Sequence, residues 1–275
     1  MKINLLLSLL LFNLAACQPA SESKKWPPTD TLANDHLRVA VDAAAGGRIS
    51  SFRVDGEEIL QTTRDTNGWQ WGSTVWLSPQ RAWGWPPPAT FDAAPYVLTR
   101  TGERELLLTS AVDSATQLQL TKRLLLRDTA LALTLTLYNR GDTLRNYGLW
   151  SNTRLPYAGQ LKFTPGDSIR VEKIDSPVAY RKDFRADIHF DERHPKNGKV
   201  FSNLITGGVH YYTSAGTRFT QTTPHLSYAE VAPDQAPLEV YLAPEDGFAE
   251  FELQGPYGPI APGDSLVFGL LWSGE

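Results

Sequence analysis

The stretch LALTLTLY, residues Leu131–Tyr138, places leucine at every second position and alanine, threonine or tyrosine between. Successive side chains of a β-strand point to opposite faces, so this pattern predicts a strand whose leucine face is turned toward a core. The following residues, Asn139–Asp142, read NRGD, a composition that favours a turn. The stretch therefore indicates one long strand of an antiparallel sheet that ends in a turn.

The same period of two recurs on both sides of this stretch, whereas a sustained apolar period of 3.6 residues is rare. Gly46-Gly47 and Asp55-Gly56 supply turns near the start. No short internal repeat is visible, which disfavours a propeller or a solenoid. The alternation predicts further strands at Leu37–Val41, Ile49–Val54, Leu106–Leu108, Thr116–Leu120, Lys122–Leu126, Leu238–Leu242, Phe248–Leu253 and Leu266–Trp272.

The composition supports an all-β chain and disfavours some partners. Eight Trp, ten Tyr and eleven Phe, with 19 Pro and 21 Gly, suit strands and loops better than helices. The net charge is -4 and no basic stripe is present, so nucleic acid is not expected as a partner. The lone cysteine, Cys17, allows the folded domain no internal disulfide.

The N-terminus has the layout of an export signal. One basic residue, Lys2, precedes the short leucine-rich run Leu5–Phe12, which is too short for a transmembrane helix of about 20 residues. Leu14–Cys17 reads LAAC and resembles a bacterial lipobox, in which the cysteine is acylated. We therefore expect a lipoprotein signal peptide at 1–17, a tether at 18–30 and one domain at 31–275. Residue 18 is not aspartate, which favours the outer membrane within the cell envelope.

Four stretches resemble galactose-mutarotase-like (aldose 1-epimerase-like) domains, the first three named here in the order in which those domains carry them. They are Gly46–Ile49 after the opening strand, the long strands of Leu120–Asp142, the closing hairpin of Phe251–Phe268, and Trp76–Pro88. The last of these looks most like an uncharacterised subgroup with a Trp/Pro-rich loop. The resemblance implies an all-β supersandwich of two large curved antiparallel sheets, with few helices and a ligand cleft on the concave face.

The late strand carries the candidate general base. By the period of two, Glu250, Glu252 and Gln254 share one face of Phe248–Leu253 and its continuation. The resemblance implies a catalytic glutamate there, and Glu252 lies closest to it, with Glu250 beside it. A solvated sheet face is the alternative interpretation.

The resemblance also implies a histidine as the acid, after a short Gly-Leu strand. In this chain Trp150 or Ser151 stands there, and an indole cannot shuttle a proton. The arginine expected before the Trp/Pro loop is also missing, because residues 70–73 read QWGS. His210 is a weak candidate for a substitute acid, as is His225.

The Trp/Pro loop supplies candidate ligand contacts. Flat rings stiffened by neighbouring prolines can stack on the apolar face of a sugar, with polar neighbours as hydrogen-bond partners. Core packing is the alternative for each ring. The predicted ligand-binding residues are Trp71, Trp76, Gln80, Arg81, Trp83, Trp85 and Trp150, and Trp69 also lies in this run.

Asp187, His189 and Asp191 share one predicted strand face, and carboxylate and imidazole are both metal ligands. The flanking basic residues favour a solvated hairpin loop instead. We therefore assign no metal site and no cofactor to the chain. Whether these three residues bind a metal is a question that the sequence leaves open.

These observations predict a lipid-anchored carbohydrate-binding protein of the cell envelope, non-catalytic or accessory to glycan processing. The alternative is a sugar epimerase or another carbohydrate-active enzyme that uses Glu252 as its base. A purely structural envelope role is a third hypothesis.

Overall fold

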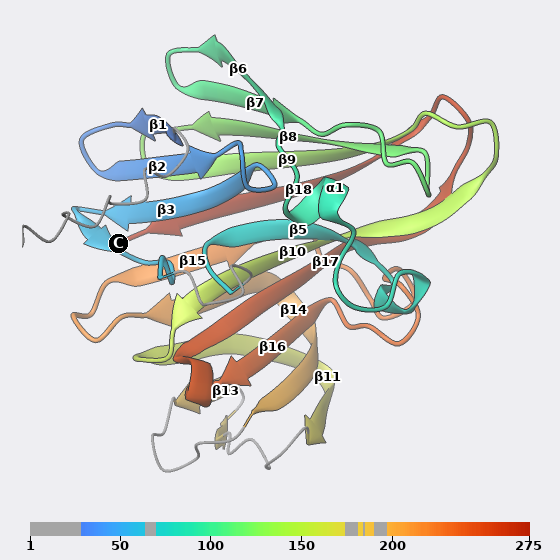
Figure 1. Ribbon diagram of the computed structural model, residues 1–275. Coiled ribbons are helices and arrows are strands. Elements are labelled where there is room, and N and C mark those ends of the chain that lie inside the picture. The colour runs from blue at the N-terminus through green and yellow to red at the C-terminus, as the bar shows by residue number, and fades with distance from the viewer. Residues whose placement is uncertain (1–28, 64–69, 174–180, 184, 190–196) are drawn as a thin grey trace, which may run out of the picture.

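The structure of the protein, a computed structural model, describes residues 29–63, 70–173, 181–183, 185–189 and 197–275 (Figure 1). For residues 29, 165–173, 181–183, 185–189 and 204–207 it describes the backbone alone. The described part consists of eighteen β-strands, one short α-helix and two turns of 3-10 helix. No helix in these ranges is long and apolar enough to span a bilayer.

Two large antiparallel sheets make up the fold (Figure 1). The first sheet contains, in spatial order, β1 (Thr29–Ala33), β2 (Leu37–Asp42), β3 (Arg48–Val54), β5 (Ser73–Ser78), β10 (Arg145–Pro156), β17 (Phe248–Ile260) and β16 (Leu238–Ala243), with β4 (Glu57–Glu58) beside β3. The second sheet contains β6 (Val97–Gly102), β7 (Glu105–Thr109), β8 (Leu118–Leu126), β9 (Ala130–Asn139), β18 (Ser265–Gly274) and β15 (Arg218–Thr222).

The long strand β14 (Gly198–Tyr212) joins the two sheets. Its start, Gly198–Ser202, pairs with β16, and its end, Gly208–Tyr212, pairs with β15. β11 (Gln160–Lys173) pairs with both parts of β14, and β13 (Arg185–His189) and β12 (Arg181–Asp183) follow at the edge. The connecting segments include η1 (Gln80–Ala82), α1 (Ala89–Asp92) and η2 (Pro244–Asp246).

The core lies between the sheets, and the alternating stretch behaves as predicted. Leu131, Leu133, Leu135 and Leu137 are all buried on β9, while the alternate residues Ala132, Thr134, Thr136 and Tyr138 are half-buried. The predicted all-β sandwich of two large antiparallel sheets is therefore confirmed. β1 begins at Thr29, inside the range expected as tether.

One prediction of strand boundaries was wrong. Thr116–Leu120 and Lys122–Leu126 were expected as two strands, but β8 runs unbroken from Leu118 to Leu126. Buried and less buried residues alternate along the whole of β8 without a break at Thr121, and Lys122 occupies one of the buried, core-facing positions. Its ammonium donates to the carbonyls of Gly46 and Gly47 at 2.7 and 3.1 Å, so a polar residue occupies a core position without ending the strand.

The turn at Gly46 fixes how α1 sits against the first sheet. Gly46 has a φ of +73°, which favours glycine, and a Cβ there would lie 2.0 Å from the carbonyl oxygen of Asp92. This close approach brings Asp92, the last residue of α1, to Arg48 and β5.

Candidate functional site

Five neighbouring strands of the first sheet build one polar face. Alternate residues of β5, β10, β17, β16 and β14 point away from the core, and the strand register aligns them in rows. In one row Asn152 pairs with Glu252 and Glu252 with Glu239. In the next row Arg154 pairs with Glu250. The residues between them, such as Phe251 and Leu253, belong to the core, as the predicted face of the late strand requires.

A cleft of about 330 Å³ opens over these rows, and we call it the tryptophan cleft. Its aromatic lining is Trp76, Trp85, Trp150, Tyr241 and Phe248. Its polar lining is Gln70, Gln80, Arg154, Lys199, Glu250 and Glu252. The volume and the mixture of aromatic rings with a few polar groups are typical of a small-molecule site.

Three indoles form the aromatic wall. The ring of Trp76 meets that of Trp150 edge-on, with centroids 5.2 Å apart, and that of Trp85 in the same way at 5.9 Å. Trp76 and Trp150 are only 5% and 2% exposed, but Trp85 is 64% exposed. Trp85 therefore offers the ring with the most surface to a ligand.

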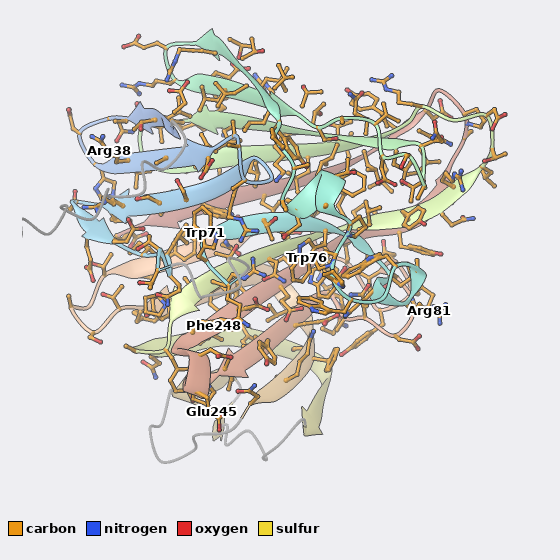
Figure 2. The ribbon with its side chains drawn as sticks, in the orientation of Figure 1. Arg38, Trp71, Trp76, Arg81, Glu245 and Phe248 are labelled. Atoms are coloured by element: carbon orange, nitrogen blue, oxygen red, sulfur yellow. The ribbon has the colours of Figure 1, made fainter. Side chains whose placement is uncertain are left out.

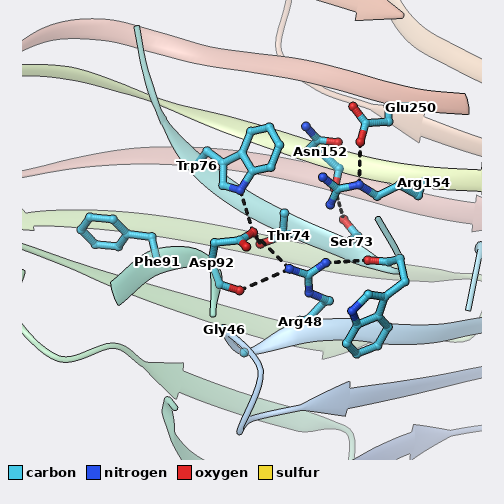
Figure 3. Close-up of polar contacts among 12 residues, drawn as sticks. Gly46, Arg48, Ser73, Thr74, Trp76, Phe91, Asp92, Asn152, Arg154 and Glu250 are labelled. Carbon is cyan, nitrogen blue, oxygen red and sulfur yellow. Dashed lines mark hydrogen bonds and ion pairs between the residues drawn. The ribbon is translucent and has the colours of Figure 1, made fainter. Parts of the chain in front are cut away.

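A buried ion pair forms one part of the cleft floor. The Nε of Arg154 lies 2.6 Å from a carboxylate oxygen of Glu250, and both side chains are buried (Figure 3). The same guanidinium lies over the ring of Trp76, 5.1 Å from its centroid. A charge-assisted bond and a cation–π contact thus hold Arg154 in one orientation beside the aromatic wall.

A second buried cluster adjoins this pair. The Nζ of Lys199 lies 2.6 Å from Glu239 and 2.9 Å from Glu252, each through a carboxylate oxygen. It also lies 5.2 Å from the ring centroid of Trp150. Glu252 is therefore not on a solvated sheet face, which was the alternative interpretation, since it is 2% exposed and ion-paired.

The cluster has unusual acid–base properties. Burial raises the pKa of Glu252 from 4.5 to about 8, because the neighbouring carboxylates of Glu239 and Glu250 add to the effect and the Lys199 ammonium only partly offsets it. Burial alone lowers the pKa of Lys199, but the two carboxylates outweigh it and hold that pKa above its ordinary value. Near neutral pH the cluster therefore keeps a proton on Glu252 and a charge on Lys199.

Asp92 anchors the aromatic wall from beneath (Figure 3). One of its carboxylate oxygens accepts hydrogen bonds from the Trp76 indole at 2.7 Å, from the Thr74 hydroxyl at 3.0 Å and from Arg48 at 3.1 Å. All of these groups are buried. The sequence analysis did not find this hub, because Asp92 follows the Trp/Pro loop and no local pattern links it to Arg48.

Several buried polar atoms near the cleft have no hydrogen-bond partner among the described residues. They are the indole nitrogen of Trp150, one terminal nitrogen of Arg154, and both side-chain polar atoms of Asn152. Buried polar groups are almost always hydrogen-bonded, to protein or to ordered water. A ligand hydroxyl or a bound water would satisfy the Trp150 and Arg154 donors, which belong to residues that line the cleft.

The structure brings six of the predicted site residues together and places four elsewhere. Lining the cleft are Trp76, Gln80, Trp85, Trp150, Glu250 and Glu252. Trp71 is buried beneath the guanidinium of Arg48, and Figure 2 shows its ring well apart from that of Trp76. Trp83 packs against Trp76 and donates to the Leu77 carbonyl at 2.9 Å, and Arg81 lines an adjoining hollow.

The candidate acid does not join Glu252. His210 lies on the part of β14 that pairs with β15, and its Nδ1 is 2.9 Å from the Thr220 hydroxyl. His225 lies in the exposed loop after β15. No histidine lines the tryptophan cleft in the described part of the chain.

Other predictions fall outside what the structure describes. Cys17 and Trp69 lie outside the described residues, and so does Asp191. Asp187 and His189 lie on β13, where only the backbone is described. Among the described residues no group of three or more His, Cys, Asp or Glu side chains is arranged to hold a metal.

The sequence analysis missed the charged residues Arg154, Lys199 and Glu239 of this site, and also the lining residues Gln70, Tyr241 and Phe248. Arg154 has the same strand phase as Trp150, which was a usable signal once β10 was assigned. Lys199 gave no such signal, because β14 meets β16 only through a long-range pairing. Glu239 lies on β16, the sequence neighbour and hairpin partner of β17, and was overlooked although the predicted strand at 238–242 contained it.

The strands are arranged as a β-sandwich of the galactose mutarotase-like fold, so the predicted fold is confirmed. Residues 65–273 match the family described as "Domain of unknown function (DUF4380)", and the chain belongs to that family. No curated protein matches the chain.

Solved structures share the fold at low sequence identity. The Slr1438 protein from Synechocystis sp. PCC 6803 has a TM-score of 0.68 at 14% identity, covering 94% of this chain and 99% of its own. A galactose mutarotase-like protein from Lactobacillus casei ATCC 334 has a TM-score of 0.66 at 12% identity, covering 90% and 100%. A galactose mutarotase related enzyme from Lactobacillus acidophilus has a TM-score of 0.64 at 11% identity, covering 90% and 97%. One fold hosts many functions, so function has to be argued from the cleft.

Proposed function

We propose that the protein binds a carbohydrate in the tryptophan cleft. The observation that carries the proposal is the accessible ring of Trp85 facing the same cleft as two buried, oriented charge clusters, Arg154 with Glu250 and Lys199 with Glu252. A sugar ring presents apolar C–H faces and a rim of hydroxyl groups. The indole suits the first and the charged groups suit the second.

The charge balance of the cleft favours a neutral sugar over a strongly charged one. The cations of Arg154 and Lys199 are already paired with carboxylates, and the raised pKa of Glu252 keeps that side chain largely protonated near neutral pH. A carboxylic acid and an ammonium supply hydrogen-bond donors to hydroxyl oxygens, and Glu250 supplies acceptors. Binding then rests on hydrogen bonds and stacking without a large net charge.

A second candidate function, proton transfer to and from a sugar, is favoured by one observation. The pKa of Glu252 is raised to about 8, and a catalytic acid or base works best with a pKa near the working pH. A mutarotase-like reaction needs a second proton-transfer group across the ring. The Arg154 guanidinium offers hydrogen-bond donors only and is ion-paired with Glu250, and the carboxylates hold the pKa of Lys199 above its ordinary value. We therefore rank binding ahead of catalysis.

We further propose that this domain is displayed in the cell envelope by a lipid on Cys17. The support is the sequence alone: the leucine-rich run, the small residues before Cys17, and the Pro-punctuated segment that follows. Several acyl chains would anchor the protein stably, since each buried methylene contributes about 0.8 kcal/mol.

A glycan array followed by titration of intrinsic tryptophan fluorescence tests carbohydrate binding. Wild-type protein should bind at least one sugar, and Trp85→Ala should weaken that binding by about tenfold or more through lost stacking. Because Trp85 is largely exposed, the variant should unfold at nearly the same denaturant concentration as the wild type. Tyr228→Ala is the matched control and should leave binding unchanged, because this exposed aromatic ring lies outside the cleft lining. Folded protein that binds no sugar on the array would contradict the proposal.

A further inference from the structure

We infer that the tryptophan cleft is one end of a longer groove that takes two or more linked sugar rings, an inference that rests on the proposed carbohydrate binding. A second hollow of about 250 Å³ adjoins the cleft. The two hollows share Gln80 and Lys199 as lining residues. A ligand that fills both therefore passes over Lys199.

The second hollow continues the same sheet face. Phe201 on β14 pairs with Glu239 on β16, and Glu239 pairs with Glu252 on β17, so one cross-strand row runs beneath both hollows. Above this floor, Arg81 from η1 faces Asp234 from the loop before β16, with nitrogen and oxygen 2.7 Å apart. The two segments form the walls of one continuous groove.

The chemistry of the second hollow matches that of the first. Phe201 and the proline rings of Pro79 and Pro233 supply apolar surface, while Gln235 and the Arg81–Asp234 pair supply polar groups. In the first hollow the same mixture comes from indoles and buried ion pairs. A repeated alternation of apolar surface and polar rim is suited to successive rings of one oligosaccharide.

Lys199 is placed to bind the ligand at the junction. An ammonium carries three N–H donors, and Glu239 and Glu252 account for two of them. The third is available to an oxygen between two rings, such as the glycosidic oxygen. Because both carboxylates already orient the Lys199 ammonium, the side chain loses little conformational entropy when it binds a ligand.

Polar atoms without partners among the described residues occur on both sides of this junction. The Trp150 indole nitrogen and a terminal nitrogen of Arg154 belong to the tryptophan cleft, and the side-chain oxygen of Gln235 belongs to the second hollow. Each is buried, so each needs a hydrogen bond from water or ligand. The Trp150 and Arg154 nitrogens can donate to ligand hydroxyl groups at one end of the groove, and the Gln235 oxygen can accept from a ligand hydroxyl group at the other end.

Titration calorimetry with a ladder of sugars tests the inference. The probes are glucose, galactose, mannose, xylose and N-acetylglucosamine, each with its linear homo-oligosaccharides of two to four rings. For the sugar that binds, we expect the two-ring form to bind at least about tenfold more tightly than the one-ring form. Gln235→Ala should weaken two-ring binding by roughly two- to tenfold, the effect of one hydrogen bond, and leave one-ring binding unchanged.

Two controls separate the inference from the proposed function. Trp85→Ala should weaken one-ring and two-ring binding alike, and Gln119→Ala, which changes a glutamine on β8 outside both hollows, should change neither. Equal affinity for one and two rings, with no effect of Gln235→Ala, would overturn the longer groove and leave carbohydrate binding standing. Binding of no sugar of any length by the folded protein would overturn both.

Discussion

The ammonium of Lys199 on β14 lies 2.9 Å from a carboxylate oxygen of Glu252 on β17, with β16 between the two strands. The same ammonium lies 2.6 Å from Glu239 on that intervening strand. One buried cation thus serves two buried carboxylates from two strands. The stability of this part of the first sheet therefore depends on a charge balance, and the ligand cleft lies directly over it.

Removing the cation should destabilise the protein strongly. We expect Lys199→Met to lower the free energy of unfolding by about 3 kcal/mol at pH 8, because it leaves two buried carboxylates without a counter-charge. The loss should be smaller at pH 5, where the raised pKa of Glu252 keeps that side chain protonated and so relieves the repulsion. Arg81→Met, at an exposed ion pair, is the control and should change stability by less than about 1 kcal/mol. Equal effects of the two changes in urea unfolding would contradict this account.

The raised pKa of Glu252 predicts the sign of a pH dependence. The folded protein keeps a proton on Glu252 up to a pKa of about 8, whereas the unfolded chain releases it near 4.5. Between these two pH values the folded state binds more protons than the unfolded chain, so the free energy of unfolding falls as the pH rises. The contribution of the Glu252 proton to stability is fully present below pH 4.5 and is lost as the pH rises to 8. The slope is at most about 1.4 kcal/mol per pH unit.

Glu252→Gln, which cannot titrate, tests this sign. Urea unfolding of wild type and variant from pH 5 to 9 should show the wild type losing stability relative to the variant as the pH rises. Parallel profiles over that range would mean that Glu252 is ionised in the folded protein throughout.

The hub at Asp92 should be sensitive to loss of its charge. Asp92→Asn removes the counter-charge of the buried Arg48, and we expect a loss of about 3 kcal/mol in the free energy of unfolding. The fluorescence of the folded variant should shift as well, because the carboxylate holds the indole of Trp76 at 2.7 Å. Asp128→Asn, at an exposed pair with Arg104, should be nearly neutral in both measurements. An Asp92→Asn variant as stable as the wild type, with unchanged fluorescence, would show that Asp92 does not anchor Trp76.

An assay of anomer exchange by NMR distinguishes binding from catalysis. We expect wild-type protein to leave the exchange rate of the aldoses that it binds unchanged, because no histidine among the described residues lines the cleft to work with Glu252. Fast exchange by the wild type, slowed roughly 10²–10⁴-fold in Glu252→Gln, would instead identify Glu252 as a general acid–base group.

The lipid anchor is tested in the native host. Wild-type protein should sediment with membranes and incorporate labelled palmitate, and Cys17→Ser should abolish the label, since Cys17 is the one cysteine in the chain. Soluble, unlabelled wild-type protein would contradict the lipoprotein proposal.

The sequence by itself determined the fold class and the phase of the strands. The leucines of β9 and the pair Glu250 and Glu252 on β17 were assigned to the correct faces. The physical reason is that the period of two is local: neighbouring side chains of a strand must point to opposite faces whatever the strand pairs with. The same local alternation misled at Lys122, where a charged residue in an inward position was taken as the start of a new strand.

Only the tertiary structure decided which of these faces forms a cleft and what its charges do. Trp71 and Trp76 lie close in the sequence, yet one packs beneath Arg48 and the other lines the cleft, because Asp92 and the register with β10 fix Trp76. Lys199 meets Glu252 because β14 pairs with β16, whose paired residues lie at least 36 positions later in the chain, and β16 pairs with β17. Burial by those distant strands raises the pKa of Glu252, since a carboxylate in a polar solvated face would keep its ordinary value. Register and burial are properties of the assembled sheets, and no local pattern in the sequence carries them.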